Sequence, residues 1–570
     1  MTTNDRPWLK HYGPKTRADI AVNDFRNIAE MLKHAAEKFK RKKAFTTCMS
    51  NGMNGSLSFE QVDRKSDAFA LYLREKVGLK AGDRVVLQMP NCLSYPVAAF
   101  GVLKAGCVLV NTNPLYTARE MQHQFVDSGA KLIVIINMFT DKLQEVSKVH
   151  SFDEVLVSRV SDFFNPAVGR VMDLILKYWN KQVPTSPYQD NCFELAVRWG
   201  EKNFDRSKLE GYLKDISPET LAVLQYTGGT TGVSKGAMLS HLNLMSNMQQ
   251  IFELIGTEIE EGKETVMTAL PLYHIFAFTV NLMGFYTKGG HNILIPNPRP
   301  LSNLKRAFEN YPITWLPAVN TLLNALTQEV WFCDSPPKTL KAAVAGGMAL
   351  QETVAARWAE VTGTPVTEGY GLTEASPVIS FNPFNGPKKR NSIGVPLPST
   401  FVRLELENGE IAAPGEPGEL CCFGPQVMLG YWNQPEETAK TLREGWLKTG
   451  DIAVFDEDGY LKIVDRKKDM IVVSGFNVYP NEVEDCLVKH PMILEAAVIG
   501  ISDEKTTEAV KAFIVLKSGV DMPEVTEKEI MAHCKQLLTA YKLPRVIEFR
   551  NELPKSPVGK ILRKELRREV

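Results

Sequence analysis

The chain has 570 residues, more than one hydrophobic core usually holds, so we expect two or more domains. Lysine plus arginine and aspartate plus glutamate both number 66, and this zero formal charge argues against a general nucleic-acid-binding protein. The nine cysteines include no C-x-x-C pair, which predicts reduced thiols and no zinc site.

Helix-like and strand-like patterns alternate through the first half of the chain. Residues 59–76 have the apolar spacing of a helix, and a turn then leads to the apolar strand RVVLQMP. A second helical pattern at 96–104 precedes the strand CVLVNTNP, and the β-branched run LIVIIN follows at 132–137. This order predicts an α/β fold with parallel sheets that are covered by helices.

A loop rich in glycine and threonine follows the strand-like residues 221–225. Residues 227–236 read TGGTTGVSKG, and such a loop brings backbone N–H groups, hydroxyls and the Lys235 ammonium onto phosphate oxygens. The spacing is not that of a Walker A loop, in which Ser or Thr follows the lysine; here Gly236 follows it. We therefore predict a phosphate site of another kind.

The segment 265–287 contains no charged residue and is long enough to span a membrane. Pro271, His274 and Asn281 interrupt it, which favours a buried strand, a turn and a buried helix. The N-terminus has no apolar signal-peptide core, so we expect a cytoplasmic protein with at most peripheral membrane contact.

The composition changes near residue 390. Glycine and proline turns between 394 and 465 predict short antiparallel strands. The charged run DRKKD at 465–469 then precedes about 100 residues of mixed strands and helices, enough for a small domain with its own core.

Five segments in order resemble the adenylate-forming superfamily of acyl-CoA synthetases, luciferases and adenylation domains: YTGGTTGVSKGAMLSH, EGYGLTEASP, GWLKTGDIA, VDRKKDMIVVSGFNVYPNEVE and LPKSPVGKILRKEL. The residues of these segments are most similar to those of bacterial long-chain fatty acid–CoA ligases. The resemblance implies a large N-terminal domain (1–465) of two α/β sheets and a distorted β-barrel. It also implies a hinge (466–469) and a small mobile α+β C-terminal domain (470–570).

The same resemblance implies a two-step reaction that uses ATP, Mg²⁺ and coenzyme A. A carboxylate attacks the α-phosphorus of ATP, and the CoA thiol then displaces AMP from the acyl adenylate. The implied contacts with the leaving phosphates are Thr227, Gly228, Gly229, Thr230, Thr231, Gly232 and Lys235. The resemblance implies that Thr227 and Glu374 bind magnesium, which prefers one or two carboxylates together with phosphate oxygens.

The remaining implied roles divide between nucleotide, acid and CoA. The resemblance implies that the nucleotide is contacted by Gly347, Tyr370, Gly371, Thr373, Asp451 and Arg466. Lys560 corresponds to the lysine that stabilises the adenylation step, and Lys468 lies in the hinge. Gly475 would line the pantetheine tunnel, His274 lies beside the acyl carboxylate, and Phe278 falls at an acyl-tunnel gate.

The acid is predicted to be hydrophobic. No acidic residue occurs between Glu264 and Glu309, so a substrate ammonium would lack the partner that its burial requires. A long-chain fatty acid is the favoured substrate; a medium-chain or aryl acid and a luciferase-like oxygenase remain alternatives. A binding protein without catalysis is disfavoured, because the implied lysines and Glu374 are all present. The sequence leaves a homodimer open.

Overall fold

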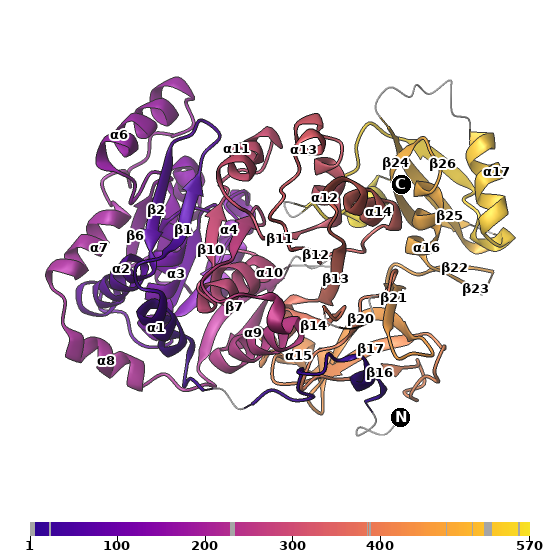
Figure 1. Ribbon diagram of the computed structural model, residues 1–570, viewed down its shortest axis with the longest axis horizontal. Coiled ribbons are helices and arrows are strands. Elements are labelled where there is room, and N and C mark those ends of the chain that lie inside the picture. The colour runs from indigo at the N-terminus through magenta and orange to yellow at the C-terminus, as the bar shows by residue number, and fades with distance from the viewer. Residues whose placement is uncertain are drawn as a thin grey trace.

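The computed structural model describes residues 6–21, 24–227, 234–384, 386, 389–474, 476–503, 505–517, 527–556 and 559–569. Within these residues the backbone forms four sheets, and helices cover the two largest (Figure 1). The mixed α/β architecture with a smaller C-terminal domain confirms the predicted fold class.

A seven-stranded sheet carries the first predicted strands. Its strands β7, β4, β3, β5 and β6 are parallel, and β8 and β18 join antiparallel at one edge. In β5, Leu132 and Val134 face one apolar cluster and Ile133 and Ile135 face another, which explains the unbroken apolar run. In sheet order the strands are β18 (Gly430–Tyr431), β8 (Lys235–Ser240), β7 (Leu221–Thr227), β4 (Val108–Asn111), β3 (Arg84–Gln88), β5 (Leu132–Ile136) and β6 (Glu154–Ser158).

A nine-stranded sheet packs beside it. The strands from β1 to β13 along the sheet are parallel, and β2, β14 and β15 are antiparallel additions. In sheet order they are β15 (Val395–Pro396), β14 (Val378–Phe381), β13 (Val366–Gly371), β12 (Ala342–Ala345), β11 (Trp315–Ala318), β9 (Thr265–Thr268), β10 (His291–Leu294), β1 (Lys43–Cys48) and β2 (Asn54–Ser58).

The uncharged segment 265–287 is buried, as predicted. It forms β9, a turn at Pro271, the short helix α10 (Ile275–Ala277) and the helical turns η6 (Phe278–Phe285), whose side chains are all buried. Among the described residues, no helix combines the length and apolar character that crossing a membrane requires.

Helices of the N-terminal part begin at short polar caps. The Ser58 side chain accepts from Gln61 N at the start of α2, and Thr117 does the same for Glu120 N at α4. Their bounds are α1 (Ile28–Phe39), α2 (Phe59–Leu71), α3 (Ser94–Lys104), α4 (Ala118–Ser128), α5 (Thr140–Val146), α6 (Pro166–Leu174), α7 (Phe193–Lys202), α8 (Arg206–Lys214), α9 (His241–Ile255), α11 (Ser302–Asn310), α12 (Asn320–Leu326), α13 (Val330–Asp334) and α14 (Glu352–Thr362).

The predicted antiparallel strands form a third sheet, with α15 (Pro435–Thr441) at its edge. This sheet is the β-rich module that the sequence places before the C-terminal domain. Its strands are β16 (Phe401–Glu405), β17 (Gly418–Phe423), β20 (Trp446–Phe455), β19 (Leu442–Arg443) and β21 (Leu461–Arg466).

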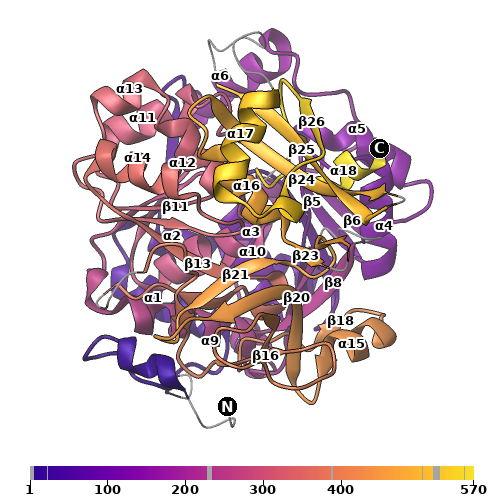
Figure 2. The ribbon, with the colours of Figure 1, turned by 90° about the vertical axis from the view of Figure 1, so that its right-hand side faces the viewer.

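The last 100 residues form a fourth sheet with its own apolar core, as predicted (Figure 2). Strand β26 pairs parallel with β25, and the other pairs are antiparallel. The elements are β22 (Ile471–Val473), β23 (Phe476–Val478), α16 (Pro480–Val488), β24 (Ile493–Asp503), β25 (Thr507–Leu516), α17 (Glu527–Leu537), β26 (Val546–Phe549) and α18 (Arg563–Arg568).

The contact between α2 and α7 gives a stability prediction. A Cβ at Gly200 would lie 1.9 Å from the backbone oxygen of Ala68, so Gly200→Ala should force the helices apart and cost about 2 kcal/mol. Gly211→Ala in α8 is the matched control, because a Cβ there meets nothing within 4 Å. That change should be neutral or stabilising by about 0.5 kcal/mol. Thermal unfolding midpoints check the order, and equal midpoints would contradict it.

Candidate active site

The two ends of the glycine-rich loop lie side by side in the structure. Thr227 ends β7 and Lys235 begins β8, and the two are paired across the antiparallel strands. Thr227 Oγ1 donates to Lys235 O at 3.5 Å. The predicted phosphate contacts Gly228, Gly229, Thr230, Thr231 and Gly232 lie outside the described residues.

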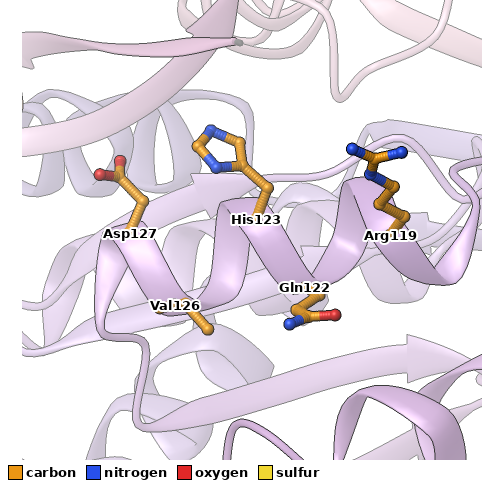
Figure 3. A pocket seen from close by; sticks show the side chains of 5 residues that line it. All are labelled: Arg119, Gln122, His123, Val126 and Asp127. Carbon is orange, nitrogen blue, oxygen red and sulfur yellow. The ribbon is translucent and has the colours of Figure 1, made fainter.

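One side of helix α4 holds both strands of this hairpin. Figure 3 shows Arg119, His123 and Asp127 projecting from one side of the helix and Gln122 and Val126 from the other, and all five line a pocket. His123 Nε2 lies 2.9 Å from Ser234 O, and Tyr226 Oη donates to Asp127 Oδ2 at 2.6 Å. The helix therefore fixes the chain immediately before and after the loop.

Lys235 is held by a carboxylate that no motif marks. Its Nζ lies 2.5 Å from Glu437 Oε2, and Lys440 Nζ lies 2.7 Å from the other oxygen. The hydrogen bond from Lys235, with help from Lys440, lowers the pKa of Glu437 to about 2. Lys235 also lies 5.0 Å from the centre of the Tyr431 ring.

Tyr431 links Lys235 to Glu374. Its hydroxyl donates to Glu374 Oε1 at 2.7 Å, and Met428 N donates to Glu374 O at 2.8 Å. Burial raises the pKa of the Glu374 carboxyl, a shift that the hydrogen bond from Tyr431 opposes. The structure therefore brings Glu374 and Lys235, 139 positions apart in the sequence, to one aromatic ring.

A second polar group forms where β13 meets the antiparallel sheet. Tyr370 Oη donates to Asp451 Oδ2 at 2.5 Å, and Arg466 Nε lies 3.4 Å from Asp451 Oδ1. Asp451 and Arg466 are cross-strand partners in β20 and β21, so their side chains share a face. Three of the six residues that the resemblance assigns to the nucleotide are thus brought together.

Two of the predicted nucleotide residues are glycines for steric or conformational reasons. A Cβ at Gly371 would lie 2.0 Å from Pro377 O, and Gly347 has a φ of +80°. Thr373 and Glu374 belong to the short turn η7 (Thr373–Ala375), which Leu372 separates from Gly371. Gly371 is therefore required by the close approach of the backbone at Pro377, and Gly347 by its left-handed backbone conformation.

His274 caps α10 through Nδ1, which accepts from Phe276 N at 3.3 Å. The neutral ring therefore carries its proton on Nε2. Burial lowers the pKa of His274 to about 4, and the charge of Lys560 adds to this shift. Phe278 is fully buried in the turns that follow.

Lys560 reaches this region from the C-terminal domain. Gly559 has a φ of +81°, and a Cβ there would lie 2.4 Å from Thr321 Oγ1 of α12. Burial, followed by the positive charge of Arg466, lowers the pKa of Lys560 to about 7. Burial and Arg466 also lower the pKa of Lys468, to about 8. The site thus gathers cations that repel one another.

A cluster of acids around Arg563 connects this lysine to the predicted hinge. Arg563 Nη2 lies 2.7 Å from Glu484 Oε2, and Arg563 Nη1 lies 3.4 Å from Asp469 and 3.6 Å from Asp465. Asp465, fully buried, also accepts from Asn481 N at 2.7 Å. Residues 466–468 of the predicted hinge are therefore flanked by two carboxylates, Asp465 and Asp469, that share Arg563. Gly475 lies outside the described residues, between β22 and β23.

The arrangement suits a phosphate-bearing substrate on two grounds. At one end of the site, the paired residues Thr227 of β7 and Lys235 of β8 supply a hydroxyl and an ammonium group. At the other end, Lys560, Arg466 and Lys468 supply positive charge. Sequence reasoning missed His123, Asp127, Tyr431 and Glu437. The only available signal was that Tyr431 is aromatic and Glu437 is charged, within the turn-rich stretch 394–465.

Comparison with known proteins agrees with this geometry. The AMP-binding enzyme family matches residues 32–432, and the AMP-binding enzyme C-terminal domain matches residues 482–560. The chain belongs to the AMP-binding enzyme family.

Individual relatives match along almost the whole chain. A long-chain-fatty-acid–CoA ligase of Escherichia coli O6:H1 is 45% identical and that of Bacillus subtilis 36% identical; each alignment covers 99% of this chain and 98% of the relative. The crystal structure of ATP-bound MatB from Rhodopseudomonas palustris has a TM-score of 0.78 at 25% identity, covering 95% of this chain and 99% of that one.

The lowered pKa of Lys560 makes a chemical prediction. Because only a neutral amine reacts with acetic anhydride, labelling of Lys560 should reach half its maximum near pH 7. Lys440 is the control, since its hydrogen bond to Glu437 raises its pKa above 10.5. ATP should slow the labelling of Lys560 at pH 8, because anionic phosphates raise the pKa of a nearby ammonium. Mass spectrometry of peptides measures both, and parallel profiles for the two lysines would contradict the burial argument.

Proposed function

We propose that this chain is an ATP-dependent ligase that converts a long-chain fatty acid to its CoA thioester. A carboxylate oxygen attacks the α-phosphorus, the bond to the bridging oxygen breaks, and pyrophosphate leaves. The CoA sulfur then attacks the acyl carbon, the bond to AMP breaks, and the thiol proton is released. The observation that carries the proposal is the placement of Lys560 beside Arg466, Asp451 and His274 at the junction of the two domains.

The proposed roles follow the charges of the first step. Charged Lys560 stabilises the negative charge that accumulates as the carboxylate meets the α-phosphate. Asp451 accepts ribose hydroxyls, with Tyr370 and Arg466 fixing its two oxygens. Lys235 exchanges Glu437 for phosphate oxygens. The glycine-rich residues 228–232 supply the remaining N–H and hydroxyl donors.

Magnesium fits the donors at the other end of the triphosphate. Glu374 provides a carboxylate whose pKa is raised by burial, so a cation beside it would favour the ionised form. Thr227 provides a hydroxyl oxygen, and Mg²⁺ prefers such hard ligands together with phosphate oxygens. When bound, Mg²⁺ would neutralise charge on those oxygens.

The acyl substrate is proposed to be apolar. The segment from β9 through η6 is buried and uncharged, and no carboxylate occurs in it to pair with a substrate ammonium. The names of the full-length bacterial relatives support a long chain over a medium-chain or aryl acid. Phe278 is retained as the proposed gate.

The second step is proposed to follow a rotation of the C-terminal domain (470–570) about residues 466–469. Rotation would withdraw Lys560 and present Gly475 to the pantetheine arm. Lys468 then leaves the neighbourhood of Arg466, which relieves the repulsion that lowers its pKa. We also propose that the protein contacts membranes peripherally. We further propose that it forms a homodimer, which sedimentation velocity would test.

Three variants test whether docking of Gly559 supports adenylation specifically. Gly559→Ala should lose at least about tenfold in ATP–pyrophosphate exchange, because its Cβ would displace Lys560 by striking Thr321. Thioester formation from supplied acyl-AMP and CoA should persist, since that step uses the rotated domain. Thr321→Ala added to Gly559→Ala should restore exchange by removing the oxygen that the new Cβ meets.

Gly409→Ala is the matched control. Its φ of +85° imposes the same cost of about 1 kcal/mol on alanine, but a Cβ there meets nothing within 4 Å. Both half-reactions should therefore match those of the unaltered protein. Equal loss of both half-reactions in Gly559→Ala, with the fold intact, would refute the two-state proposal.

A further inference from the structure

Helix α6 and the π-helical turn that continues it form a surface segment that is apolar on two sides. The segment 166–179 is anchored on its inner side by Met172 and Gly169, both buried. Just before it, Phe164 is buried and packs so closely on β2 that a Cβ at Gly55 would lie 2.3 Å from its ring. The segment is therefore a fixed part of the fold.

Its outer side carries large apolar side chains in water. Val171, Leu174, Tyr178 and Trp179 are 49%, 57%, 67% and 86% exposed. Val171, Leu174 and Tyr178 succeed one another at spacings of three and four, so they share one side of the helix. A surface helix normally places mainly polar residues on its outer side, whereas this segment exposes four large apolar side chains there.

Basic residues frame these apolar side chains. Arg170, Lys177 and Lys181 are exposed, and within the described part of the chain they form no ion pair. The one acid of the segment, Asp173, is bound at its base by Arg159 at 3.1 Å and by Ser161. The outer side is therefore apolar and net positive, although the whole chain has zero formal charge.

We propose that this outer side, defined by Arg170, Val171, Leu174, Lys177, Tyr178, Trp179 and Lys181, docks on the surface of an anionic bilayer. The apolar side chains enter the acyl boundary, Tyr178 and Trp179 lie at headgroup level, and the basic groups meet lipid phosphates. A second copy of the chain fits less well, because a two-fold contact would set these cations against themselves.

The position of the segment agrees with this role. Helix α6 lies at the upper left of Figure 1, and α16 and α17 of the C-terminal domain lie at the opposite end. A bilayer held at α6 would thus leave the proposed domain rotation free. The proposed acyl substrate partitions into membranes, but the docking inference is carried by the exposed side chains alone.

Vesicle flotation of the full chain tests the inference. The protein should float with vesicles of phosphatidylcholine and phosphatidylglycerol in equal parts, and far less with phosphatidylcholine alone or at high salt. The double variant Leu174→Ser with Trp179→Ser should bind at least about tenfold more weakly. Val330→Ser, at a 73% exposed valine in α13, should bind like the unaltered protein.

A second variant separates charge from apolar contact. Lys177→Gln with Lys181→Gln should lose the preference for anionic vesicles and retain ligase activity on detergent-dispersed acid. Flotation that neither double variant weakens would overturn the proposal. The proposal would also be overturned if the unaltered protein failed to float and instead formed a dimer that the double variant Leu174→Ser with Trp179→Ser dissociates. The outer side of the segment would then bind a second copy of the chain. The assay needs no turnover, so its failure is distinct from failure of the proposed function.

Discussion

The contact of Gly559 with Thr321 is the constraint on which the proposed chemistry depends. A positive φ and the lack of a Cβ let the C-terminal loop lie against α12, and this approach carries Lys560 into the N-terminal site. The consequence is electrostatic: Lys560, Arg466 and Lys468 crowd together, and burial with mutual repulsion lowers the pKa of both lysines. A polyphosphate would relieve that repulsion, so the site is arranged for an anion before one binds.

The other charged groups of the site, Lys235, Glu374 and Asp451, each form a hydrogen bond or ion pair with another side chain. Lys235 is paired with Glu437, Glu374 with Tyr431, and Asp451 with Tyr370 and Arg466. The pairs of Glu374 and of Asp451 satisfy carboxylates that burial would otherwise penalise. Only the Lys235 pair joins two partly exposed side chains, and it is the one that we propose to open toward phosphate.

Much of the fold was predictable because local patterns agree with tertiary burial. The continuous apolar run of β5 indicated a strand buried on both faces, and the uncharged segment around Pro271 indicated a buried turn. Tyr370, Asp451, Arg466 and Lys560 were selected by resemblance alone, and in the structure they lie near one another. Their roles stay proposals.

Partners supplied from outside the motifs were not predictable. Glu437 and Tyr431 reach the site through the pairing of β18 with β8, and His123 reaches it from α4, which local sequence does not reveal. The exposed side of α6 was not predictable for another reason. Large apolar residues occur on both the buried and the exposed side of that helix, so the apolar pattern of the sequence does not indicate which side is exposed.

ATP–pyrophosphate exchange without CoA, measured with straight-chain acids of increasing length together with benzoate and phenylalanine, tests whether this chain adenylates a long-chain fatty acid. We expect exchange to rise to an optimum among the long-chain fatty acids, because the segment from β9 through η6 is apolar and contains no carboxylate to pair with an ammonium. An optimum with phenylalanine or benzoate, or no exchange with any acid despite bound ATP, would contradict this expectation.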